Sequence, residues 1–283
     1  MNWYDHTQGG CYKGGAAEIN KYNEAVSSRR LSNPVDKSVY FYASIVEELE
    51  ENGYAVIRNA IDVEKVKALA ETTSRMMLDP SALKLNNASF QMIEQPLYNV
   101  DGAFELAFDD MLVGIASEYF NCLPAIGTVN MKKTKLNNHQ PADALLYHSD
   151  SNSIKFLKFF FYLNDVDIDG GPFTYIQGSH KKKFFGWQEK YRWSDNEIEG
   201  AYGKESVKHL TANVGDLIIC NVTGFHKGLK PRNKERTMYT VNYTIHPEYW
   251  KPITFKIRKE DYERLSEEKK PVADFLLTRK RGG

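Results

Sequence analysis

The run Phe156–Leu163, FLKFFFYL, constrains the fold of this chain more than any other segment. Successive side chains of a β-strand point to opposite faces, yet apolar residues occupy both alternating sets of this run. Such a strand is stable where a second layer covers each of its faces. We therefore expect it in a sheet that packs against another sheet on one side and against helices on the other.

Helical periodicity dominates before residue 124, and strand periodicity dominates after it. Helices are expected over residues 39–51 and 104–119 and after Asp62, an expected N-cap, with a short strand at 54–58. The expected later strands are Ala125–Lys135, Ala144–His148, Ile154–Leu163, Phe173–Ile176, Asp216–Asn221 and Arg236–Ile245. This order lacks βαβ alternation. It predicts a mostly β fold, a jelly roll with N-terminal helices packed on one sheet.

We interpret the 283 residues as a single domain. Residues 1–38 form an irregular arm, 39–123 a helical support, 124–246 the jelly-roll core and 247–283 a C-terminal extension. An aromatic-rich insertion at 181–209 interrupts the core. It is either a lid over a site or a surface excursion packed on its own aromatic residues.

Composition narrows the partners and the compartment. The 37 basic and 37 acidic residues balance, so no overall field would recruit nucleic acid or an anionic membrane. No apolar stretch approaches the roughly 20 residues that span a bilayer, and the N-terminus lacks a secretory pattern. Three cysteines without a CxxC pair indicate a reducing compartment. We expect a cytoplasmic protein acting on a small molecule, of unknown oligomeric state.

His148 and Asp150 end an apolar run, and residues two apart on a strand share a face. Taken alone, they are more simply a core histidine and a turn cap. The later His226, with Gly228 leaving space beside it, changes that balance. Two histidines and one carboxylate form the facial triad of non-haem Fe(II) oxygenases.

Arg236 opens the last predicted strand, with Met238 next on the same face. An arginine inside an apolar barrel is costly unless an anion meets it, and a dicarboxylate would be a natural bidentate partner. Alternatively, Arg236 points outward among its basic neighbours. Arg232 is the rival anchor, although its place after Pro231 suggests a solvated turn.

These motifs resemble the phytanoyl-CoA dioxygenase-like (PhyH) family of Fe(II)/2-oxoglutarate-dependent oxygenases. The match rests on residues 148–150, on 226–228 with Arg236, and on the Gly-rich run 170–181. In that run Gln177 stands where the family has proline. The resemblance covers roughly residues 45 to 246.

The resemblance implies a double-stranded β-helix (cupin-like) with His148, Asp150 and His226 as iron ligands and catalytic residues. It implies that Arg236 binds the distal carboxylate of 2-oxoglutarate. Met238 stands where many relatives have Ser or Thr, so the second contact must come from elsewhere. The candidates are Tyr162, Thr174 and Asn130.

The implied reaction uses Fe(II), 2-oxoglutarate and O2 to hydroxylate an unactivated C–H bond, releasing succinate and CO2. The family's halogenases carry a small residue in place of the carboxylate, so Asp150 favours hydroxylation. Two alternatives stay open: a non-catalytic jelly-roll metal- or ligand-binding protein, and a 2-oxoglutarate-independent cupin-type dioxygenase. Arg236 separates the latter from the leading interpretation. Lys181–Lys183 would suit an anionic or carrier-linked substrate, or would simply be a solvated face.

Overall fold

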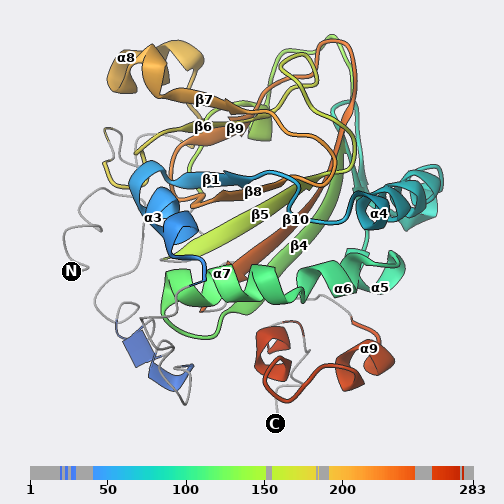
Figure 1. Cartoon of the computed structure of the whole chain (residues 1–283). Helices are drawn as coiled ribbons and strands as arrows, with labels where there is room; N and C mark the ends of the chain where they lie inside the picture. The colour runs from blue at the N-terminus through green and yellow to red at the C-terminus, as the bar shows by residue number, and fades with distance from the viewer. Residues whose placement is uncertain are drawn as a thin grey trace.

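The computed structural model describes residues 41–150, 155–182, 184, 191–245, 257–274 and 276, together with 20, 23, 24 and 27–29. Two antiparallel sheets are stacked face to face. The large sheet has the order β1 (Tyr54–Ile57), β8 (Leu217–Cys220), β5 (Phe156–Tyr162), β10 (Arg236–Thr244), β4 (Ala125–Thr134), β3 (Phe90–Ile93) and β2 (Leu83–Asn86). The small sheet has the order β7 (Val207–Leu210), β6 (Phe173–Ile176) and β9 (His226–Gly228). The predicted mostly β, cupin-like jelly roll with flanking helices is confirmed (Figure 1).

The strand β5 is covered on both faces, as its apolar sequence predicts. Leu157, Phe159 and Phe161 belong to the core on the helical side of the large sheet. The alternate residues Phe156 and Phe160 belong to a second core between the two sheets. The burial of both sets leaves Lys158 as the one charged residue of β5, on the side that faces the small sheet.

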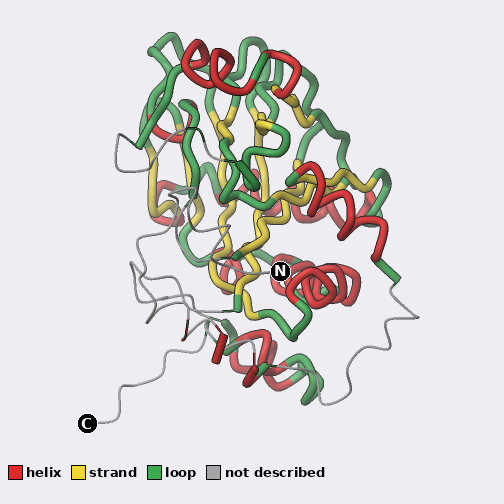
Figure 2. Tube along the Cα trace, turned by 90° about the vertical axis from the view of Figure 1, so that its left-hand side faces the viewer, coloured by secondary structure: helices red, strands yellow, loops and turns green. Residues whose placement is uncertain are grey.

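Helices cover the outer face of the large sheet. They are α3 (Ala43–Asn52), α4 (Val63–Met76), α5 (Pro96–Asn99), α6 (Ala103–Ala107) and α7 (Asp110–Phe120). Figure 1 shows α6 and α7 beneath this sheet, and Figure 2 shows strands in the middle of the molecule with helices around them. Tyr239 and Tyr243 of β10 anchor α6, because their hydroxyls donate to the carbonyls of Ala103 and Ala107, each at 2.6 Å.

Three details of the predicted elements differ from the structure. The single helix predicted over 104–119 is two helices, because the Asp109 side chain accepts a hydrogen bond from the Met111 amide and starts α7 anew. The strand predicted at Ala144–His148 is a 3-10 turn, Asp143–Leu145, followed by isolated bridges at Tyr147 and His148. The hairpin β2–β3 was not predicted. The predicted N-cap at Asp62 is confirmed, because its side-chain carboxylate accepts a hydrogen bond from the Glu64 amide.

The insertion predicted at 181–209 is in part a core strand, because its last residues, 207–209, belong to β7 of the small sheet, a strand that was not predicted. Before β7 it contains α8 (Asp195–Tyr202), and its Trp193 and Ile198 pack with Tyr147 and Phe225. No described residue of this insertion lines the pocket analysed below. Residues 183 and 185–190 lie outside the described part, so the lid stays a prediction.

The two ends of the chain are described in part. Arg29, from the predicted arm, donates to the carbonyls of Leu123, Pro124 and Pro271 and pairs with Asp274. The C-terminal extension contributes α9 (Lys259–Glu263) and a 3-10 helix, Lys270–Ala273, whose Val272 and Ala273 join the helical-side core. Within the described residues, no helix has the length and apolar character needed to cross a bilayer.

Candidate active site

Backbone pairing brings the two predicted histidine ligands face to face. The His148 amide donates to the His226 carbonyl at 2.9 Å, and the His226 amide donates back at the same distance. Residues that exchange both hydrogen bonds across an antiparallel pair carry their side chains on one face. The ring centroids accordingly lie 4.3 Å apart. Asp150 lies two residues after His148 on the same segment, and its backbone amide donates a hydrogen bond to the Val222 carbonyl.

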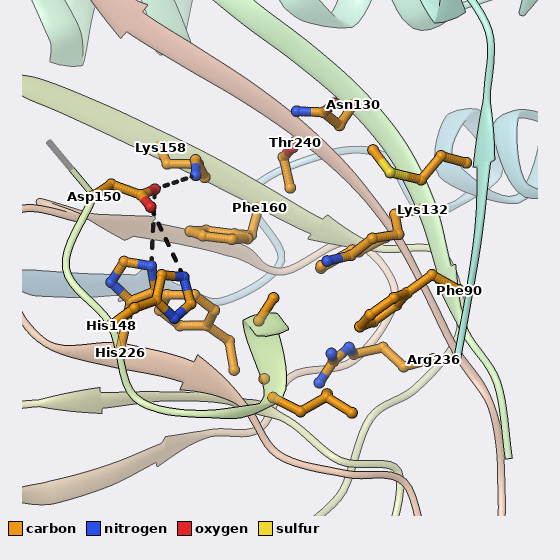
Figure 3. Close-up of a pocket in the computed structure, with 16 residues that line it drawn as sticks. Phe90, Asn130, Lys132, His148, Asp150, Lys158, Phe160, His226, Arg236 and Thr240 are labelled. Atoms are coloured by element: carbon orange, nitrogen blue, oxygen red, sulfur yellow. Dashed lines mark hydrogen bonds and ion pairs between the residues drawn. The ribbon is translucent and has the colours of Figure 1, made fainter. Parts of the chain in front are cut away.

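The three side chains converge on one point (Figure 3). His148 Nε2 lies 3.8 Å from Asp150 Oδ1, and His226 Nε2 lies 3.8 Å from Asp150 Oδ2. One potential ligand atom from each residue lies within 4.8 Å of the others, which is the arrangement of a metal site. Sequence reasoning therefore named the three residues that the fold brings together.

Hydrogen bonds fix both imidazoles in the form that binds a metal. His148 Nδ1 donates to the Leu146 carbonyl at 2.8 Å, and His226 Nδ1 donates to the Gly224 carbonyl at 2.9 Å. A carbonyl oxygen can only accept, so each Nδ1 carries the proton and each Nε2 keeps its lone pair. Ligand histidines are commonly oriented in this way by their second nitrogen.

The charge states also suit a divalent cation. Burial lowers the pKa of His148 and lowers that of His226 well below its usual value, so both rings are neutral at pH 7. Burial alone would raise the pKa of Asp150. Lys158 and the two histidines outweigh it and hold that pKa well below its usual range. Neutral imidazoles and an ionised carboxylate match Fe(II) or Mn(II).

Arg236 lies at the other end of the same cavity, pointing inward from the start of β10. It is 1% exposed, and its Nη2 donates to Thr134 Oγ1 at 3.1 Å. Its Nε has no hydrogen-bond partner among the described residues. A buried guanidinium with an unpaired donor is costly, and an anion bound beside it would remove that cost. The rival Arg232 is exposed and pairs with Asp169.

Gly228 leaves the space that the Arg236 guanidinium occupies. A Cβ built on Gly228 would lie 2.6 Å from Arg236 Nη2. We expect Gly228→Ala to displace the guanidinium and to raise the KM for the bound anion by about 10- to 100-fold, since a shift of about 1 Å can cost that much. The matched control is Gly200→Ala, where an added Cβ meets nothing within 4 Å. Equal kinetics for the two variants would contradict this role of Gly228.

A cavity of about 170 Å³ joins the triad to Arg236. Its other lining residues are Phe90, Met92, Asn130, Lys132, Ala144, Leu145, Lys158, Phe160, Phe173, Gly228, Met238 and Thr240. Sequence reasoning missed the two lysines. Lys158 was visible as the single charge in an apolar strand, whereas Lys132 carries no such signal because it lies beside Lys133 in an alternating run.

Lys132 projects from β4 into the cavity between the triad and Arg236 (Figure 3). Its ammonium lies 4.7 Å from the centroid of the Phe90 ring. Its pKa falls to about 7, because burial and then the neighbouring cations Arg236 and Lys158 oppose its charge more than Asp150 supports it. An anion bound between Lys132 and Arg236 would relieve this repulsion.

Asn130 is the one predicted auxiliary residue that lines the cavity. Its Oδ1 accepts a hydrogen bond of 3.4 Å from Lys84 Nζ on β2. Thr240, its partner in the β10–β4 register, lies beside it on the cavity wall. The cavity therefore also offers two polar side chains that are not charged.

Tyr162 and Thr174 do not line the cavity. The Tyr162 hydroxyl donates to the Leu210 carbonyl at 3.1 Å and accepts from the Phe173 amide at 2.7 Å. The Thr174 hydroxyl lies 2.9 Å from His209 Nδ1. Both hydroxyls are thus engaged in joining strands, and we look to other residues for the second contact with an anion.

Comparisons with known proteins agree with this geometry. The sequence model of the family described as phytanoyl-CoA dioxygenase (PhyH) matches residues 49–238. No curated protein matches the chain.

Three solved structures illustrate the likeness in fold. The epimerase SnoN, in complex with Fe3+, alpha ketoglutarate and nogalamycin RO, is 14% identical with a TM-score of 0.56, covering 71% of this chain and 82% of its own. EctD from S. alaskensis with bound Fe is 16% identical with a TM-score of 0.56, and the match covers 76% of this chain and 83% of EctD. HygX from Streptomyces hygroscopicus, with nickel and 2-oxoglutarate bound, is 17% identical with a TM-score of 0.53, and the match covers 73% of this chain and 87% of HygX. At such identities the likeness establishes a shared fold.

Proposed function

The chain belongs to the phytanoyl-CoA dioxygenase family of Fe(II)/2-oxoglutarate-dependent oxygenases, and we propose that it hydroxylates an unactivated C–H bond of a small molecule. One observation carries the proposal. A buried His148–Asp150–His226 cluster and the unpaired guanidinium nitrogen of Arg236 line the same cavity.

In this proposal His148, Asp150 and His226 hold the iron through the two Nε2 atoms and a carboxylate oxygen. When bound, iron and 2-oxoglutarate supply the oxidising chemistry, in which O2 and 2-oxoglutarate become succinate and CO2 and one oxygen atom goes to the substrate. The apolar wall formed by Phe160 and Phe173 keeps water from the reacting C–H bond.

Arg236 and Lys132 together bind the distal carboxylate of 2-oxoglutarate. Arg236 supplies the unpaired Nε, and Lys132 supplies an ammonium that projects into the space between Arg236 and the triad. A carboxylate between two cations forms charge-assisted hydrogen bonds with both. Lys132 thereby replaces the hydroxyl that Met238, two residues after Arg236, cannot provide.

The outcome of the oxidation is the finer part of the proposal. Solved structures of similar fold include an epimerase and a carbocyclase, SnoN and SnoK, so this fold serves more than one outcome. Asp150 supports hydroxylation over halogenation, because it occupies the coordination site that a halide would need. Arg236 disfavours the 2-oxoglutarate-independent dioxygenase, because such an enzyme does not require a buried arginine to bind a carboxylate. The non-catalytic binding protein would form no succinate.

The substrate carries a negative charge in this proposal. The described cavity lining holds three cationic side chains, Lys132, Lys158 and Arg236, against one carboxylate, Asp150. Fe(II) and the 2-oxoglutarate dianion cancel each other, so a positive excess remains after both have bound. A field of that sign attracts an anion and disfavours a cation.

The test is succinate release by the Fe(II)-loaded protein over a panel of small molecules. The panel pairs each carboxylate or phosphate with its neutral amide or ester. We expect release above the substrate-free rate with anionic members and little with their neutral partners. Stimulation by neutral or cationic members alone would contradict the anionic substrate. Succinate release in the absence of any panel compound is uncoupled turnover, and it is compatible with the proposed iron site. If the protein forms no succinate under any condition, the proposed oxygenase activity is contradicted.

A further inference from the structure

Lys158 makes a direct side-chain contact with one of the proposed metal ligands. Its Nζ donates to Asp150 Oδ2 at 2.8 Å, and both side chains are 20% exposed. Figure 3 shows the lysine on the far side of the Asp150 carboxylate from the two histidines. The rest of β5 is apolar, so the sheet places one ammonium at this carboxylate and nowhere else along the strand.

The backbone holds Lys158 firmly. The lysine lies in the middle of the large sheet, paired with Cys220 of β8 on one side and with Asn242 of β10 on the other. Asp150 comes from an extended segment at the small-sheet side, where its amide bonds to Val222. The sheet therefore fixes the backbone position from which the Lys158 side chain reaches the Asp150 carboxylate.

A cation beside a site for another cation needs an explanation. Electrostatics alone would make Lys158 weaken the binding of a divalent metal. A carboxylate has two oxygens, however, and can bind a metal through one or both. A facial triad requires one-oxygen binding, because the remaining positions must stay open for the other reactants.

We propose that Lys158 is a positioning residue that engages Oδ2 of Asp150, so that the carboxylate binds the metal through Oδ1 alone. The lysine acts through Asp150 and does not itself bind the metal. Its loss frees the carboxylate to rotate, so that Oδ1 is no longer held toward the metal and the number of coordinating oxygens is no longer fixed. The inference rests on the metal site of the proposed function.

If Lys158 only repels the metal, its removal should tighten metal binding. If it orients Asp150, its removal should weaken metal binding. Partners that orient a ligand are worth about 10- to 100-fold in metal affinity. Lys158→Met should therefore bind Co(II) about 10- to 100-fold more weakly than wild type, measured by calorimetry without 2-oxoglutarate. The visible spectrum of the Co(II)-loaded variant should also change, since it reports the number of ligands. Lys158→Gln, which keeps an N–H donor but removes the charge, should bind closer to wild type.

Lys132→Met is the matched control, because it removes another ammonium from the same cavity without touching Asp150. It should leave Co(II) affinity unchanged or raise it. The proposal is overturned if Lys158→Met binds Co(II) as tightly as wild type or more tightly, or if both Met variants lose affinity equally. Failure of the wild-type protein to bind Co(II) would instead defeat the metal site itself. Should Lys158→Met not fold, Lys158→Leu carries the same test: a loss of about 10-fold or more in Co(II) affinity supports the proposal, and an affinity equal to that of wild type or tighter overturns it.

Discussion

Replacing His148 by alanine is expected to weaken Fe(II) binding by about 200- to 300-fold and to remove succinate formation at micromolar iron. The three ligands share the metal's binding free energy, and about a third of roughly 10 kcal/mol is lost with one of them. Among the described residues, the other histidine of the cavity is His226, which already belongs to the proposed ligand set and so cannot replace the His148 ring. Calorimetric titration with Fe(II) under anaerobic conditions measures the effect.

The control for this variant is His139→Ala. His139 is exposed and lies outside the cavity lining, and it forms its hydrogen bonds with Asn137 and Lys230 through its backbone. It should retain wild-type iron affinity and turnover. Iron affinity that is unchanged in His148→Ala would show that the metal is bound elsewhere.

Replacing Arg236 by methionine is expected to raise the Kd for 2-oxoglutarate at least about 30-fold while leaving the fold as stable as before. Loss of one partner of a buried charge pair costs about 2 to 5 kcal/mol. Without 2-oxoglutarate, the same guanidinium is a buried charge with an unpaired Nε, so removing it relieves a cost rather than creating one. Burial lowers the pKa of Arg236, which reflects the same cost.

Two measurements check this prediction together: 2-oxoglutarate binding to the metal-loaded protein, and the thermal midpoint of the metal-free protein. Arg232→Met is the control, because Arg232 is exposed and pairs with Asp169. Lys132→Met should show a smaller rise in Kd, since Arg236 remains. A large fall in the midpoint of Arg236→Met would mean that the arginine is structural and would contradict the anion site.

The layering of the fold could be predicted from one strand. An apolar residue at nearly every position of β5 requires cover on both faces, and the two cores that divide its side chains provide it. Local competition was harder to predict. Asp109 splits a continuous apolar stripe because it caps a new helix, and the four-residue strands β2 and β3 are too short to show a period.

The clustering of His148, Asp150 and His226 could be predicted because histidine and carboxylate in a known order carry their chemistry in the sequence. The lysines and the auxiliary hydroxyls could not, because their roles depend on register. Lys132 and Arg236 share a cavity because β4 pairs with β10, and that pairing is set by contacts far apart along the chain. Tyr162 depends on a different pairing, that of β5 with β10, and its hydroxyl donates to the Leu210 carbonyl outside the cavity lining.

The cavity is expected to bind Fe(II) and 2-oxoglutarate together. The most direct test is the visible absorption of the wild-type protein with both added under anaerobic conditions. We predict a weak charge-transfer band that requires both components and is absent from His148→Ala. A correctly folded wild-type protein that shows no such band, and forms no succinate when O2 is admitted, would contradict the account.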